Sequence, residues 1–282
     1  MKNKIEYIKV KDNFLSKEKF TLFLNEANKT LITFPKPSKE KLPRYYESPE
    51  YLSHKSSGKS MFSKVFFISR RIMLYSKLKM ISALIPNPGS VVDVGSGTGY
   101  FLSGLKKKGW STQGIEPNLL ARKMAIKNNI VHSKSLKELK KRELDLITFW
   151  HSLEHVFSLE EALFQTKQAL KNKGFLIVAC PNYMSWDAKY YKKDWAAWDV
   201  PRHLRHFSSK SLALILEPMG FKQVKKKPLI LDAFYISILS EKQKGSRFSF
   251  LKGFVVGAFS NFLGFFSNNY SSQVYVFQKT DK

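Results

Sequence analysis

The sequence contains a single cysteine, Cys180, among 282 residues. One cysteine cannot form a disulfide within the chain or a thiolate zinc site by itself, which excludes disulfide scaffolds and zinc ribbons. The first fourteen residues also lack the apolar run of a secretion signal, because charged residues interrupt them every few positions. A reducing compartment fits both absences, so we expect a cytoplasmic protein.

Acidic residues and arginines are both scarce. The 22 Asp and Glu residues are outnumbered by 48 Lys and Arg, which gives a formal net charge of +26, yet only eight of the 48 are Arg. A strong positive charge is typical of nucleic-acid-binding proteins, but phosphate and base recognition depend heavily on the bidentate guanidinium group. The lysines are dispersed along the sequence, which favours a generally basic surface over a nucleic-acid site.

The apolar content is that of a folded protein. Hydrophobic residues make up 43% of the chain and aromatic residues 14%, enough to bury one large core with or without an appendage. Disordered, collagen-like and coiled-coil architectures are excluded. Residues 1–60 lack clean periodicity and include a proline- and tyrosine-rich stretch, which predicts an N-terminal arm outside the core. Residues 61–282 are expected to form the main domain.

Between Ser90 and Cys180 the hydrophobic pattern alternates between the strand period and the helix period. Strands are predicted at 91–94, 111–116, near 130, at 144–150 and at 175–180, with amphipathic helices between them. This alternation specifies a parallel sheet with helices on both faces. We expect an α/β fold with a Rossmann-like, doubly wound, seven-stranded and mostly parallel sheet, completed by a strand near 221–224 and an edge strand at 271–279. A ligand should bind at the carboxyl ends of the strands.

The strongest functional signal is a glycine-rich turn that follows the first predicted strand and opens a helix. Its sequence, DVGSGTGY, spans residues 93–100, and glycines in such a turn let the backbone approach a ligand closely. A dinucleotide fingerprint would place a third glycine at position 100, where this chain has Tyr100. Asp93 would also repel a pyrophosphate. The turn therefore disfavours a nicotinamide-dependent oxidoreductase and favours a cationic ligand.

An acidic residue follows the next predicted strand. Glu116, in the segment GIEPN, lies 21 residues beyond Gly95, where a carboxylate at a strand end can accept both hydroxyls of a ribose. A ribose attached to a positively charged group describes S-adenosylmethionine. The alternative is that Asp93 and Glu116 only cap loops and that the glycines form an ordinary turn.

With these motifs the sequence resembles the class I S-adenosylmethionine-dependent methyltransferases, and within them a bacterial branch related to ubiquinone-biosynthesis methyltransferases. The resemblance spans about residues 40–280 and also rests on LDLITFWHSLEHV at 144–156 and FLIVACPN at 175–182. It implies methyl transfer and a cofactor site lined by Asp93, Gly95, Ser96, Gly97, Thr98, Gly99, Tyr100, Glu116, Pro117, Trp150 and His151. Similar proteins carry a small cysteine-containing module before an arm like residues 45–54, and here that module lacks its cysteines.

Four histidines are the candidate catalytic residues: His151, His155, His203 and His206. If a helix begins at His151, then His151, Glu154 and His155 share one face. Some quinone O-methyltransferases have Glu-x-x-Glu-His at the similar place, where it binds a divalent cation. This chain replaces the first Glu by His, so we predict no metal.

The other two histidines, His203 and His206, belong to an aromatic loop at 184–207 that follows the fifth predicted strand. This fold usually builds its acceptor pocket there, so the aromatic side chains could stack on a planar substrate. Either histidine could take a proton at neutral pH. The alternative is a covering loop whose tryptophans belong to the core and whose histidines are hydrogen-bonded spacers.

The acceptor is expected to be a small-molecule or lipid-linked metabolite, with O-, N- or C-methylation left open. A DNA or RNA adenine methyltransferase would carry an Asn/Asp-Pro-Pro-Tyr/Phe box after the fourth strand, where this chain has FWHSLEH. The alternatives are a non-catalytic cofactor-binding protein of the same fold and a nucleic-acid methyltransferase. The sequence does not indicate an oligomeric state.

An insertion at 240–270 precedes the last predicted strand, and its residues 248–266 are rich in phenylalanine. A membrane span needs about 20 predominantly apolar residues, whereas Lys252, two serines and Asn261 interrupt this stretch, so we expect no span. We favour a lid over the acceptor pocket. The alternative is an interfacial helix that lysines draw to the anionic inner face of the membrane.

Overall fold

The computed structural model describes residues 4–47, 61–133, 135–139 and 141–280. The chain divides into two compact units. The first unit comprises Met1–Tyr51, Leu153–Phe157 and Ala179–Val276, and the second comprises Leu52–Ser152, Ser158–Val178 and Phe277–Lys282. Most of the arm motif predicted at 45–54 lies outside the described residues, except for residues 45–47.

A seven-stranded sheet has the strand order β10-β11-β8-β7-β4-β5-β6. Its strands are β4 (Ser90–Val94), β5 (Ser111–Ile115), β6 (Val131–Ser133), β7 (Leu144–Trp150), β8 (Leu170–Pro181), β10 (Phe221–Pro228) and β11 (Ser272–Lys279). β4 pairs in parallel with both β5 and β7, and β5 pairs in parallel with β6. The predicted Rossmann-like, mostly parallel sheet is confirmed.

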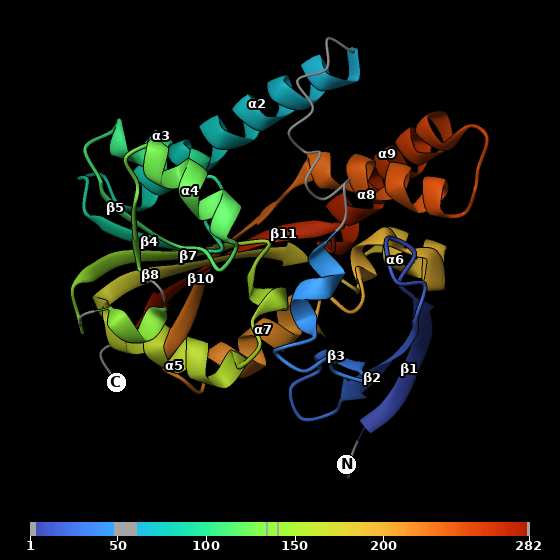
Figure 1. Ribbon diagram of the computed structural model, residues 1–282, viewed down its shortest axis with the longest axis horizontal. Helices are drawn as coiled ribbons and strands as arrows, with labels where there is room; N and C mark the ends of the chain where they lie inside the picture. The colour runs from blue at the N-terminus through green and yellow to red at the C-terminus, as the bar shows by residue number, and fades with distance from the viewer. Residues whose placement is uncertain (1–3, 48–60, 134, 140, 281–282) are drawn as a thin grey trace. The chain divides into compact units, whose positions relative to one another are not determined.

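Helices of the second unit cover both faces of this part of the sheet (Figure 1). They are α2 (Met61–Leu84), α3 (Tyr100–Lys106), α4 (Leu119–Lys127) and α5 (Leu159–Ala169), with a 3₁₀ turn η3 (Leu136–Glu138). α3 and α4 lie on one face and α5 lies on the other. Strands β4 and β7 are mostly apolar and buried, as expected when helices cover both faces. This packing holds the carboxyl ends of β4, β5 and β7 next to one another.

The first unit begins with an antiparallel sheet in the order β1-β2-β3-β9. Its strands are β1 (Lys4–Lys11), β2 (Lys19–Asn25), β3 (Leu31–Phe34) and β9 (Arg205–His206). Apolar side chains of this sheet, including Phe20, Leu22 and Leu31, are buried in one cluster with Trp195 and Trp198. The prediction of an arm outside the core is therefore wrong for residues 4–34. Core partners of these strands such as Trp195 and Trp198 lie more than 150 residues away in the sequence, so no local pattern indicates them.

The other elements of the first unit are mostly helical. They are the 3₁₀ turns η1 (Leu42–Tyr46), η4 (Leu153–His155), η5 (Lys192–Asp194) and η6 (Ala196–Trp198), and the helices α6 (Trp186–Tyr191), α7 (Ser209–Leu216), α8 (Ile230–Gln243) and α9 (Ser249–Ser267). Ser208 caps α7 by accepting a hydrogen bond from the Ser211 N–H, as its place before an apolar run predicts. α8 and α9 form a helical hairpin (Figure 1).

The prediction of an edge strand at 271–279 is wrong. β11 lies between β10 and β8, and β10 is at the edge. Most of the polar residues that indicated an edge are buried instead, and Gln273 is also hydrogen-bonded. Gln273 Oε1 accepts hydrogen bonds from Asn182 Nδ2 at 3.2 Å and from the Tyr275 hydroxyl at 3.1 Å. Polar side chains can occupy a central strand when tertiary partners satisfy them.

Candidate functional site

The glycine-rich turn after β4 has the geometry that its sequence predicts. Gly95, Gly97 and Gly99 have φ angles of +77°, +55° and +73°, in the left-handed region that favours glycine. A Cβ atom on Gly95 would lie 2.5 Å from the Ser152 Cβ, whereas a Cβ atom on Gly97 would meet nothing within 4 Å. The backbone at Gly97 is therefore open to a ligand.

Glu116, at the end of β5, is tied to this turn. Its Oε2 accepts a hydrogen bond from the Gly97 N–H at 2.8 Å, and its Oε1 accepts one from the Asn118 N–H at 2.7 Å. The loop-capping role that the sequence left open is thus present. It leaves room for a second role, because each carboxylate oxygen can accept further hydrogen bonds from hydroxyl groups.

Asp93 is buried beneath the turn and has a perturbed pKa. Its side chain accepts a hydrogen bond from the Thr148 hydroxyl at 2.6 Å. Burial raises the pKa of Asp93 to about 7, and the nearby Glu116 charge acts in the same direction, while Thr148 and Lys77 oppose the rise. A cation bound near Asp93 would favour its charged form and lower this pKa.

Trp150 ends β7 at the same edge of the sheet. The Lys77 ammonium lies 4.0 Å from the centre of the Trp150 ring, and the Phe101 ring meets it edge-on at 5.5 Å. The indole N–H is buried and has no hydrogen-bond acceptor among the described residues. A buried donor of this kind indicates a place for an acceptor atom of a ligand.

The remaining predicted cofactor residues lie on the same three loops of the second unit. Ser96 Oγ is 3.3 Å from His132 Nε2, Tyr100 stacks under the Arg70 guanidinium at 3.9 Å, and Thr98 accepts a hydrogen bond from Asn128. Pro117 is exposed, and His151 is half-buried with a φ of +52°. The eleven residues that the resemblance implies therefore lie at or directly after the carboxyl ends of β4, β5 and β7, which are neighbours in the sheet. Their role in cofactor binding stays a prediction.

Three of the four candidate catalytic histidines gather in the first unit, whereas His151 belongs to the second. The His155 ring meets the His203 ring at 4.6 Å, and the His203 ring lies 6.0 Å from the His206 ring. The backbone positions them, since the Leu204 N–H donates to the Glu154 carbonyl at 2.9 Å and joins η4 to the loop before β9.

Burial keeps two of these histidines neutral. His203 Nδ1 donates to the Ala197 carbonyl at 2.9 Å, and His206 Nε2 lies 3.3 Å from the Thr33 hydroxyl. Burial, helped by the neighbouring His155, lowers the pKa of His203 to about 4. Burial also lowers the pKa of His206 well below its ordinary value. Both side chains are uncharged at neutral pH, which makes them weak bases.

Glu154, His155 and His203 place ligand atoms within 4.8 Å of one another. A carboxylate and two imidazoles form a donor set that transition metals accept. The predicted grouping of His151 with Glu154 and His155 on one helical face is wrong, because η4 is a single 3₁₀ turn that begins after His151. The absence of a metal stays a prediction.

The aromatic loop contributes its tryptophans to the core. Trp195 and Trp198 are only 2% and 3% exposed, and their rings pack edge to face at 4.9 Å. The Trp195 indole N–H donates to Asp187 Oδ2 at 2.7 Å. For these two residues the covering-loop alternative is right, and neither side chain is available to stack on a substrate.

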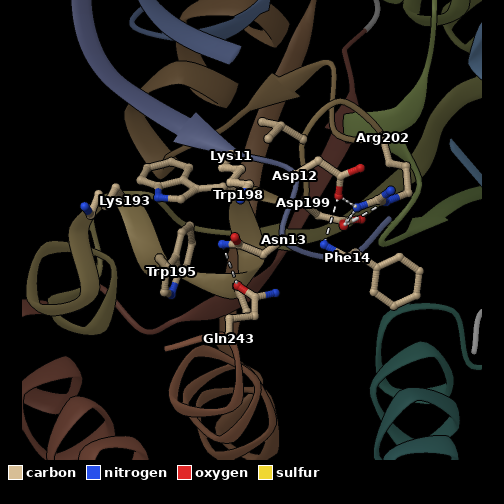
Figure 2. A pocket seen from close by; sticks show the side chains of 12 residues that line it. Lys11, Asp12, Asn13, Phe14, Lys193, Trp195, Trp198, Asp199, Arg202 and Gln243 are labelled. Carbon is tan, nitrogen blue, oxygen red and sulfur yellow. Dashed lines mark hydrogen bonds and ion pairs between the residues drawn. The ribbon is translucent and has the colours of Figure 1, made fainter. Parts of the chain in front are cut away.

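A buried ion pair that sequence reasoning missed holds this loop in place (Figure 2). The Arg202 guanidinium, 1% exposed, pairs with Asp12 at 2.9 Å and with Asp199 at 2.7 Å. It also donates to the Tyr45 carbonyl at 3.0 Å. Asp12 and Arg202 are 190 residues apart, so no local pattern could have paired them. The pair fixes the segment that carries His203 and His206.

Comparisons with known proteins identify the family. No curated protein matches the chain. In fold the chain is similar to an S-adenosylmethionine-dependent methyltransferase from Thermotoga maritima, described as a possible histamine N-methyltransferase, with 21% identity and a TM-score of 0.52 over 77% of this chain and 95% of that chain. It is also similar to an S-adenosylmethionine-dependent methyltransferase from Archaeoglobus fulgidus, with 19% identity and a TM-score of 0.52 over 78% of this chain and 100% of that chain.

A third similar structure is phosphoethanolamine N-methyltransferase 2 from Haemonchus contortus in complex with S-adenosylmethionine. It shares 14% identity and a TM-score of 0.50 over 73% of this chain and 53% of that chain. These likenesses establish the fold. A family model described as a methyltransferase domain matches residues 67–226. Because this match covers more than half of the chain, the protein belongs to the methyltransferase domain family.

Proposed function

We propose that this protein, an S-adenosylmethionine-dependent methyltransferase, binds its cofactor at residues 93–100 and methylates a small-molecule or lipid-linked acceptor. The observation that carries the cofactor site is the open backbone at Gly97, bridged to the buried carboxylate of Glu116. Asp93 adds a carboxyl group suited to a cationic ligand.

The residues at this sheet edge fit the parts of the cofactor. The remaining lone pairs of Glu116 would accept the ribose hydroxyls, and the Trp150 ring and indole N–H would border the adenosine. Asp93 would face the positively charged methionine part. When bound, S-adenosylmethionine supplies an electrophilic methyl group on its sulfonium sulfur. The protein then contributes mainly alignment of the acceptor atom with that methyl group.

The histidines divide into two proposed roles. His151 and His155 are half-buried and follow β7 in the chain, so we assign to them the removal of a proton from a hydroxyl or amine acceptor. His203 and His206 are neutral and deeply buried, so they act as positioning residues for His155. This division predicts that His203→Asn impairs turnover less than His155→Asn, because the asparagine Nδ2 can take the place of His203 Nδ1 and still donate to the Ala197 carbonyl.

A small or lipid-linked acceptor agrees with several independent observations. The chain has only eight arginines and no adenine-methylation box. Two similar proteins have names that refer to small amines, histamine and phosphoethanolamine. The resemblance to ubiquinone-biosynthesis methyltransferases favours a lipid-linked acceptor.

Calorimetric titration with S-adenosylmethionine and S-adenosylhomocysteine tests the cofactor site. We expect the wild type to bind both, and Gly97→Trp and Glu116→Ala to lose at least about tenfold in affinity, which corresponds to roughly 1.4 kcal/mol. Gly245→Trp is a matched control, because Gly245 also has a positive φ of +73° and open space around it. Unchanged binding in Gly97→Trp, or none in the wild type, would refute the site.

A further inference from the structure

The outer side of α9 is a large apolar surface that the protein leaves exposed. Its side chains, between 47% and 74% exposed, are Phe250, Leu251, Phe254, Val255, Phe259, Phe262, Phe265 and Phe266. We call this surface the α9 face. Continuous apolar patches of this kind mark sites of interaction with other molecules or with membranes.

The inner side of α9 consists of small residues. Gly253, Gly257, Ser260 and Gly264 are its buried residues. A Cβ atom on Gly253 would lie 2.5 Å from the backbone of Ile238 in α8, and one on Gly257 would lie 2.8 Å from the backbone of Phe234. In a helix of a soluble protein the large apolar side chains face the core. In α9 the small residues face the core and the large apolar residues face outward. Close backbone contact through small residues is typical of helices that pack within membranes.

Buried hydrogen bonds fix α9 in this orientation. The Ser260 hydroxyl donates to Asp187 Oδ1 at 2.8 Å. Asp187, which is fully buried, also accepts hydrogen bonds from Trp195 and from the Ser271 hydroxyl. If α9 opened as a lid, the Ser260–Asp187 hydrogen bond would break. The buried Asp187 carboxylate would then lose a hydrogen-bond donor, which costs free energy. The burial pattern therefore favours the interfacial alternative over the lid that we favoured from the sequence.

The exposed charges within residues 240–270 are of one sign. Within residues 240–270 the basic residues Lys242, Lys244, Arg247 and Lys252 are all exposed, whereas the one acidic residue, Glu241, is 4% exposed. Lysines and arginines beside an apolar helix face favour an anionic lipid surface. A second copy of this chain is disfavoured as the occupant, because it would bring the same positive charges and a net charge of +26 against this one.

We propose that the α9 face binds an anionic lipid bilayer, with its phenylalanines inserted at the boundary between headgroups and acyl chains and its basic residues against the headgroups. Among the described residues, α9 is the one helix long and apolar enough to cross a membrane. Its inner side is held by α8 and Asp187, so α9 lies along the surface and does not span. This membrane-binding site shares no residue with the glycine-rich turn at 93–100 and does not depend on the proposed function.

Flotation of the full chain tests the proposal with phosphatidylcholine vesicles that contain or lack phosphatidylglycerol. We expect the wild type to float with the anionic vesicles and less with the neutral ones. The double variant Phe262→Ser/Phe266→Ser should bind at least about tenfold more weakly, because two exposed aromatic anchors are lost. Phe164→Ser is the control, since Phe164 is a phenylalanine on α5 that is 51% exposed. The binding of this variant should equal that of the wild type.

A second pair of variants tests the charges without touching the apolar surface. Arg247→Glu/Lys252→Glu should lose binding to anionic vesicles, whereas Lys123→Glu/Lys127→Glu, the same charge change on α4, should lose much less. All substituted side chains are exposed, so circular-dichroism melting curves should match that of the wild type. The proposal is overturned if the wild type fails to float or if the phenylalanine variant floats like the wild type. It is also overturned if light scattering without lipid shows a dimer that Phe262→Ser/Phe266→Ser abolishes.

Discussion

The burial of Asp93 beneath the glycine-rich turn makes the free energy of unfolding depend on pH. Its pKa is about 7 in the folded protein and roughly 3.9 in an unfolded chain, so the folded state holds an extra proton between these values. The contribution of Asp93 to the free energy of unfolding should therefore fall as pH rises from about 4 to 7 and level off above. Asp93→Asn removes this loss, which is at most about 4 kcal/mol. The lowered pKa values of His203 and His206 act in the opposite direction, so the effect is read from the difference between the wild type and Asp93→Asn.

Urea unfolding at pH 4 and pH 8 measures this effect. Asp93→Asn should be more stable than the wild type at pH 8 and nearly equal to it at pH 4, since asparagine can still accept the Thr148 hydrogen bond. If the stability of the wild type relative to Asp93→Asn does not decline between pH 4 and pH 8, the role of burial is contradicted. In calorimetry the same variant should bind S-adenosylmethionine more weakly, so greater stability and lower affinity go together.

Arg202 is expected to be the most sensitive charged residue of the first unit. Arg202→Met leaves Asp12 buried without its partner, and breaking a buried ion pair in this way costs about 3–5 kcal/mol. Arg44→Met is the control, because the Arg44–Glu18 pair at 2.8 Å is exposed and water weakens it. Chemical unfolding should show a large loss for the first variant and little for the second. Equal effects would mean that burial does not set the strength of these pairs.

At the scale of elements, the α8–α9 hairpin depends on the absence of side chains on the inner side of α9. Gly257→Leu would force atoms into the backbone of α8 and should cost at least about 1–3 kcal/mol. Ala258→Leu, one residue along on the exposed side of α9, should leave stability nearly unchanged. Thermal unfolding of both variants measures whether a larger side chain is tolerated on the inner or on the exposed side of α9. Equal destabilisation would show that α9 packs differently.

At the scale of the whole molecule, the net charge of +26 predicts weak, salt-sensitive contact with nucleic acids. In a filter-binding series with DNA and RNA, the dissociation constant at physiological salt should be no tighter than about 1 μM, as for non-specific binding. A folded protein of similar positive net charge that has no nucleic-acid function provides the control. Submicromolar binding at that salt concentration would instead favour a nucleic-acid methyltransferase.

Local patterns in the sequence were enough to predict the α/β sheet and the glycine-rich turn after β4. The glycines at 95, 97 and 99 and the acid at Glu116 sit at strand ends, and the periods of the flanking segments show which strands these are. Each signal lies within about ten residues, where backbone sterics and hydrophobic periodicity act directly. The parallel sheet then brings the strand ends together without further information.

Contacts between distant segments were decided only by the tertiary structure. The pairing of Asp12 with Arg202, the cluster of His155 with His203, and the central place of β11 all join residues far apart in the chain. The spacing of apolar residues in α9 identified a helix but could not show which side faces outward. Which side of α9 faces outward depends on α8 and Asp187, which contact α9 only in the folded chain. The backbone of α8 leaves room for glycine but not for phenylalanine, and Asp187 accepts a hydrogen bond from the Ser260 hydroxyl.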